Sequence, residues 1–183
     1  MNEIEKLKVK IGKLVNQFNF GNYRPVIQEV NILLKKLPNN SFLLNLLGSC
    51  YQKLGKYETA KKNFQQVLVG DPNNLAAMNN LATTHKDTME FEKSEDYFEK
   101  ILKIDSNYVM ALTNYANLKF QLDQHNEAID LYNRAIALDP KSENIHYNMG
   151  LTYQSYGNFE KAKYHFDEML KINPNATMAD RLI

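Results

Sequence analysis

A regular spacing of prolines is the feature that most constrains the fold of this chain. Pro38, Pro72, Pro140 and Pro174 follow one common interval, and Ser106 stands at the omitted step. An interval of about 34 residues is typical of helical repeat arrays, in which each repeat packs against its neighbours. The spacing therefore predicts an α-solenoid whose function lies on its surface.

The same period divides the chain into repeats without any insertion. If each proline takes position 32, we expect one array over residues 1–183 with repeats at 7–40, 41–74, 75–108, 109–142 and 143–176. Small residues recur at position 8 and rings at position 24, namely Gly48, Ala82, Ala116 and Gly150, then Phe64, Phe98, Tyr132 and Phe166. Rings opposite small residues fill the core between two helices. We therefore expect ten helices of about 12–14 residues.

Glycine marks the turn between the two helices of three repeats. Gly21, Gly55 and Gly157 share position 15, where Met89 and Asp123 stand in the other two repeats. Glycine tolerates the positive φ that often ends a helix. This pattern predicts a helix-turn-helix unit within each repeat.

At these positions the chain resembles the tetratricopeptide repeat family, and the resemblance covers about 170 residues. The second repeat matches the family pattern best, with Leu44, Leu47, Gly48, Tyr51, Ala60, Phe64 and Pro72. The resemblance implies an all-α fold, a right-handed superhelical α-solenoid of five 34-residue helix-turn-helix repeats with a partial capping helix at 177–183. The repeats are similar to those of O-linked N-acetylglucosamine transferase and related bacterial proteins.

In this family the first helix of each repeat lines a concave groove, and position 6 points into it. Asn80, Asn114 and Asn148 occupy that position in consecutive repeats. Asparagine both donates and accepts hydrogen bonds, so such a row could bind the backbone of an extended peptide. The expected groove residues are Asn45, Ser49, Asn79, Asn80, Thr83, Thr113, Asn114, Asn117, Gln121, Tyr147 and Asn148. The alternative is a solvated row in a chain that is rich in asparagine throughout.

Position 5 argues against one known type of groove. It holds Ile11, Asn45, Asn79, Thr113 and Tyr147, without a lysine. The carboxylate clamp of chaperone-binding repeats needs a lysine there, so capture of chaperone C-termini is not expected.

Charge and cysteine content limit the partners. The formal net charge is +1, whereas a nucleic-acid or anionic membrane surface would show a basic excess. A single cysteine, Cys50, allows no internal disulfide and suits a reducing compartment. The N-terminus lacks the apolar core of a signal peptide, and no apolar run is long enough to span a membrane. We expect a cytoplasmic protein with a protein or peptide partner, bound to neither nucleic acid nor membrane.

The residue pattern shows no sign of catalysis. The histidines His85, His125, His146 and His165 fall at positions 11, 17, 4 and 23, without a metal-binding spacing. We expect His85, His146 and Cys50 to be packing residues. No cofactor, metal or enzymatic activity is therefore expected.

Two functions remain open at this point. The first is a scaffold that binds an extended peptide segment of a partner in its concave groove. The alternative is the non-catalytic N-terminal arm of a larger transferase-type enzyme, which recruits substrate or dimerises. Apolar residues such as Met178 and Leu182 follow the last proline. An uncapped apolar end of this kind would allow self-association through the C-terminal face.

Overall fold

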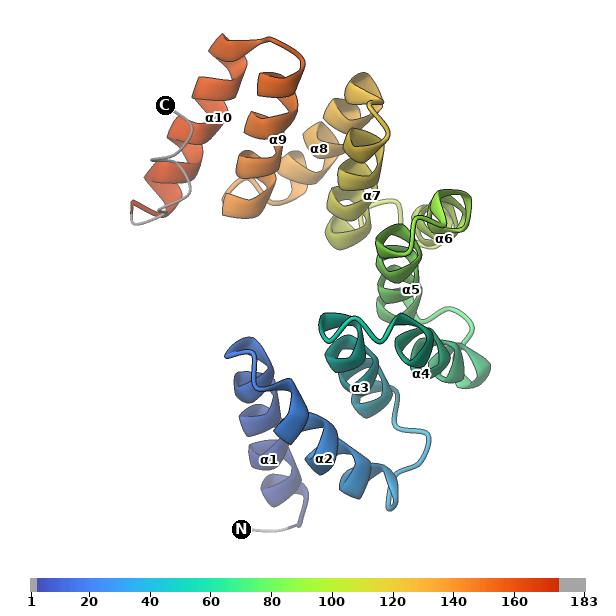
Figure 1. Ribbon diagram of the computed structural model, residues 1–183. Coiled ribbons are helices and arrows are strands. Elements are labelled where there is room, and N and C mark those ends of the chain that lie inside the picture. Colours follow the sequence, from blue (N-terminus) through green and yellow to red (C-terminus); the bar gives the residue numbers. More distant parts are fainter. Residues whose placement is uncertain (1–2, 175–183) are drawn as a thin grey trace. The chain divides into compact units, whose positions relative to one another are not determined.

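Ten α-helices and no strands make up residues 3–174, the part of the chain that the computed structural model describes (Figure 1). The helices are α1 (Glu3–Asn19), α2 (Tyr23–Leu34), α3 (Ser41–Lys53), α4 (Tyr57–Gly70), α5 (Leu75–Asp87), α6 (Phe91–Ile104), α7 (Val109–Gln121), α8 (His125–Leu138), α9 (Glu143–Ser155) and α10 (Phe159–Ile172). The predicted all-α fold is confirmed. The partial helix expected at 177–183 lies outside the described residues.

Helix starts recur along the chain at the interval that the prolines predict. From α3 onward the first helices begin at Ser41, Leu75, Val109 and Glu143, and all the second helices keep the same interval from Tyr23. Nine helices have 12–14 residues, as predicted, but α1 has 17. It begins before the expected position 7 because residues 3–6 contain no proline or glycine that would stop a helix.

The helices fall into two compact units. The first ends at Glu90 and contains α1–α5, while the second begins at Phe91 and contains α6–α10. In the first unit α3 packs on α4 and also contacts α5; in the second α7 packs on α8 and contacts α9, which packs on α10 (Figure 1). First helices of neighbouring repeats therefore lie side by side within each unit. The single array over residues 1–183 stays a prediction.

Asparagine caps explain where two of the first helices begin. The Asn40 side-chain oxygen accepts a hydrogen bond from the Leu43 N–H at 2.9 Å, and Asn74 accepts one from the Ala77 N–H at 3.0 Å. These N–H groups have no partner inside the helix, so a side-chain acceptor stabilises the first turn. Both asparagines stand at position 34 of their repeats, immediately before the helix.

The predicted packing of small residues against rings is confirmed. A Cβ atom added to Gly48 would lie 2.5 Å from Cε1 of Phe64, closer than real Cβ contacts allow. A Cβ atom added to Gly150 would likewise lie too close to the ring of Phe166. Phe64 is fully buried and Phe166 almost so. The glycines thus let the two helices of a repeat approach closely around a ring.

The turn between the two helices of each repeat has one conformation. Position 15 has a positive φ in all five repeats, including Met89 at 61° and Asp123 at 57°. The backbone bonds are the same in each turn: the Gly55 N–H donates to the Gln52 carbonyl and the Lys56 N–H to the Tyr51 carbonyl, both at 2.9 Å. This is the Schellman arrangement, which satisfies the last carbonyls of a helix.

Candidate functional site

In the first unit the predicted groove residues come together where α3 meets α5. The side-chain N–H of Asn80 donates to the Asn45 oxygen at 3.4 Å. Both side chains are half-buried, as are Ser49 and Thr83. The two amides therefore form one polar step between neighbouring first helices.

A second polar step lies further along the same pair of helices. The Gln52 amide donates to Asp87 at 2.8 Å and more weakly to the Thr83 hydroxyl at 3.3 Å. The Thr83 hydroxyl in turn donates to the backbone carbonyl of Asn80 at 3.0 Å. These bonds hold the α3–α5 face as a connected row of hydrogen-bonding side chains.

Two of the predicted groove residues are buried instead of facing solvent. Asn79 is 4% exposed and Thr113 is 5% exposed. The Thr113 hydroxyl donates to the Val109 carbonyl one turn earlier, at 2.9 Å. Both residues stand at position 5, so in these two repeats that position lies against neighbouring helices. The accessible row in these two repeats consists of positions 6 and 9, whereas Asn45 and Tyr147 at position 5 of other repeats are half-buried.

In the second unit the groove residues lie on α7 and α9. Asn114, Asn117, Tyr147 and Asn148 are half-buried, and Gln121 is exposed. The Tyr132 hydroxyl donates to the Asn117 side-chain oxygen, which ties that amide to α8. The Asn148 amide donates to Asn144 at 3.4 Å, within α9. Like Asn45 and Asn80 on the α3–α5 face, these side chains are polar and uncharged.

Two buried lysines were not expected from the sequence. Lys119, at position 11, is 8% exposed, and its ammonium lies 2.6 Å from Glu95 on α6 and 2.9 Å from Glu127 on α8. Burial opposes its charge, yet the hydrogen bonds to the two carboxylates raise the pKa of Lys119 above its ordinary value. Lys61 on α4 pairs similarly with Glu58 and Glu90. These lysines hold helices together and do not face the groove.

A buried histidine pair was also missed. His146 on α9 and His165 on α10 belong to the same repeat, and their Nδ1 atoms lie 3.1 Å apart. Nε2 of His146 lies 3.3 Å from the Pro140 carbonyl, which can only accept. His146 therefore donates through Nε2, so its Nδ1 can accept a hydrogen bond from the Nδ1–H of His165. The repeat positions could have revealed that the two residues share one helix pair.

The predicted packing roles of His85, His146 and Cys50 are confirmed by their burial. His85 and His146 are 6% and 5% exposed. Cys50 is fully buried in an apolar cluster, and this burial raises the pKa of its thiol to about 11. A thiol with such a pKa is almost entirely protonated at neutral pH and is a poor nucleophile.

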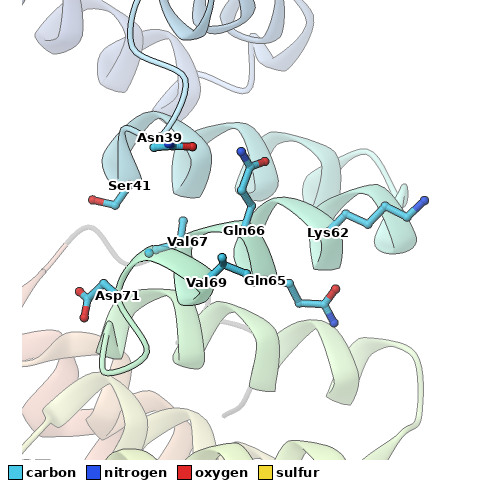
Figure 2. Close-up of a pocket in the computed structure, with 9 residues that line it drawn as sticks. Asn39, Ser41, Lys62, Gln65, Gln66, Val67, Val69 and Asp71 are labelled. Carbon is cyan, nitrogen blue, oxygen red and sulfur yellow. The ribbon is translucent and has the colours of Figure 1, made fainter.

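A separate hollow of about 670 Å³ lies on α4 and the loop before α3. Figure 2 shows its lining, which consists of Asn39, Ser41, Lys62, Gln65, Gln66, Val67, Val69, Gly70 and Asp71. It includes Val69, which is 85% exposed. None of the predicted groove residues lines this hollow.

The described residues give no support for a metal site or a membrane span. Residues 3–174 contain no group of three or more His, Cys, Asp or Glu side chains placed to hold a metal ion. No helix in the same range has the length and apolar character needed to cross a bilayer.

Comparison with known families and structures agrees with this geometry. Models of the tetratricopeptide repeat match residues 33–62, 74–104 and 144–176, and a model described as TPR repeat matches residues 116–157. Together they span more than half of the chain. The search of curated proteins finds no significant match.

Several solved structures share the fold. TTC0263, a thermophilic TPR protein of Thermus thermophilus, is 18% identical with a TM-score of 0.82, covering 92% of each chain. PilW, a type IV pilus biogenesis factor, is 21% identical with a TM-score of 0.82, covering 100% of this chain and 83% of PilW. MamA is 21% identical with a TM-score of 0.67, covering 89% of this chain and 95% of MamA. Since models of one family match along most of its length and its helices recur at the interval of that family's repeat, this chain belongs to the tetratricopeptide repeat family.

Proposed function

We propose that this chain is a protein-interaction scaffold whose first helices bind an extended segment of a partner protein. The observation that carries this proposal is the set of half-buried amides on adjoining first helices. Asn45 and Asn80 lie together in the first unit, and Asn114 and Asn148 lie on α7 and α9 in the second. Helical repeat arrays commonly bind partners along the surface that such helices line.

The chemistry of the amide suits recognition of a peptide backbone. A side-chain amide has two N–H donors and an oxygen with two lone pairs. The bond from Asn80 to Asn45 is long, at 3.4 Å, and uses one of those donors. An extended peptide presents its N–H and C=O groups at regular intervals, and an amide can pair with either kind. Binding would thus depend on the backbone of the partner more than on particular side chains.

Replacement of the three position-6 asparagines tests this function. We expect Asn80→Ala/Asn114→Ala/Asn148→Ala to weaken binding of unstructured peptides at least tenfold, because each lost bond contributes about 1 kcal/mol. Fluorescence anisotropy with labelled peptides measures the change, after circular dichroism shows equal helicity.

A matched control uses three asparagines on second helices. Asn31, Asn63 and Asn133 lie on α2, α4 and α8, and their triple alanine variant should bind as the natural chain does. Equal loss in both variants, or unchanged binding in the first, would remove the first-helix face as the site.

A further inference from the structure

Charged residues are almost absent from the first helices of the second unit. Across α7, Val109–Gln121, the one charged residue is Lys119, which is buried against Glu95 and Glu127. Across α9, Glu143–Ser155, it is Glu143 in the first turn, whose carboxylate accepts from the Asn173 amide at 3.1 Å. The middle of the α7–α9 face therefore presents no charge to a partner.

The second helices of the same unit contain many more charged residues than its first helices. They carry most of its charge, with Glu92, Lys93, Glu95, Asp96, Glu99, Lys100 and Lys103 on α6, Glu127, Asp130 and Arg134 on α8, and Glu160, Lys161, Lys163, Asp167, Glu168 and Lys171 on α10. The charges are thus sorted by helix, and the helices with few charges are the ones that carry Asn114 and Asn148.

The first unit shows a weaker sorting from α3 onward, since its second helix there, α4, carries only Glu58, Lys61 and Lys62. On α3 the one charged residue is Lys53, in the last turn, and on α5 Lys86 and Asp87 stand in the last turn. An apolar side chain is exposed in the first turn of α3 and of α7: Phe42 is 45% exposed and Met110 is 51% exposed. Each face therefore combines amides with an apolar side chain.

We infer that the partner segment is uncharged and carries aliphatic or aromatic side chains between polar ones. A surface that stays in water gains solubility from charges at little cost, whereas a charge buried without a partner is costly. Interface cores are accordingly depleted in charged residues. First helices with few charges, on which Phe42 and Met110 are exposed, match a neutral segment that offers apolar side chains to them. This inference rests on the proposed function.

Three labelled peptides of equal length test the inference. One is built from Ser, Thr and Asn with regularly placed Leu and Phe, and the other two replace several polar residues by Lys or by Glu. We expect the neutral peptide to bind at least about tenfold more tightly than either charged one. Its Kd should change less than about twofold between about 50 mM and about 500 mM salt, since no ion pair is screened.

New charges on the face give the second arm of the experiment. Asn114→Lys/Asn148→Lys should weaken the neutral peptide and strengthen the Glu peptide, whereas Asn31→Lys/Asn133→Lys on second helices should change neither. Tight, salt-sensitive binding of a charged peptide by the natural chain would overturn the inference and leave the proposed function standing. Failure of all three peptides would remove both. Sedimentation velocity tests whether a second copy of this chain occupies the face instead. A dimer that is dissociated by Asn114→Lys/Asn148→Lys, and not by Asn31→Lys/Asn133→Lys, would show such an occupant and would overturn the inference.

Discussion

Met89 and Asp123 hold a backbone conformation that suits glycine. Their φ values, 61° and 57°, lie in the left-handed region, where the equivalent residues of the other repeats are Gly21, Gly55 and Gly157. A side chain in this region brings Cβ close to the backbone and costs about 1–2 kcal/mol. The third and fourth repeats therefore carry local strain at their turns.

Met89→Gly should stabilise the protein by about 1 kcal/mol, because it removes that strain and the larger backbone entropy of glycine offsets only part of the gain. The lost side chain contributes little, since Met89 is 74% exposed. Urea unfolding followed by circular dichroism measures the difference. Gly55→Ala is the reverse control and should destabilise the protein by a similar amount; an unchanged or lower stability of Met89→Gly would contradict the strain.

Lys119 on α7 connects three helices, because its ammonium pairs with Glu95 on α6 and with Glu127 on α8. We expect Lys119→Met to lower stability by about 2 kcal/mol, because Glu95 and Glu127 then face each other without a counter-charge. Adding Glu95→Gln/Glu127→Gln should recover most of the loss. Urea unfolding of the natural chain, Lys119→Met, Glu95→Gln/Glu127→Gln and the triple variant gives the coupling free energy between the lysine and its carboxylates.

An exposed ion pair on α6, the helix that carries Glu95, serves as the control. Lys103 and Glu99 lie 3.8 Å apart on α6, both largely exposed, so Lys103→Met should change stability by no more than about 0.5 kcal/mol. If Lys119→Met and Lys103→Met cost the same, the buried cluster would not hold the helices together.

The histidine pair between α9 and α10 predicts a pH dependence. Burial, together with the neighbouring His146, lowers the pKa of His165 from 6.5 to about 4. The unfolded chain then binds the proton first, so this contribution to stability is complete above about pH 6.5 and is lost as the pH falls towards 4, by about 2–3 kcal/mol in all. The other titratable groups around the pair are Tyr153, Lys161, Tyr164 and Glu168.

The test replaces both histidines by leucine, the residue that the fourth repeat has at the same two positions. His146→Leu/His165→Leu copies Leu112 and Leu131, which are buried at the same repeat positions. Hydrogen exchange of the α10 amides should rise between pH 6.5 and 4.5 in the natural chain, after correction for intrinsic rates, and not in the variant. The same rise in both proteins would assign the pH dependence to other groups.

The 34-residue period was sufficient to predict the helices and turns, because these depend mainly on residues that are close together in the sequence. The turns and the packing of Gly48 on Phe64 follow from residues within one repeat, and the starts of α3 and α5 follow from the asparagine immediately before each helix. The burial of Asn79 and Thr113 and the pairing of Lys119 with Glu95 depend on neighbouring helices. Such contacts between helices leave no periodic signal, so the sequence could not reveal them.

For the whole molecule, the central feature is the sorting of its charges. The net charge of +1 conceals first helices from α3 onward that present few charges and second helices, α6 and α10 above all, that are dense in both signs. Charged side chains on second helices favour contact with water, whereas first helices with few charges suit the neutral partner that we propose. The proposed function and the inferred partner chemistry both follow from this division.

An NMR titration of the labelled protein with the neutral peptide tests the central claim most directly. We expect the side-chain amide signals of Asn80, Asn114 and Asn148 to shift, while those of Asn31 and Asn133 stay unchanged. Shifts confined to Asn31, Asn133 and the second helices would contradict it, because the peptide would then bind the charged face.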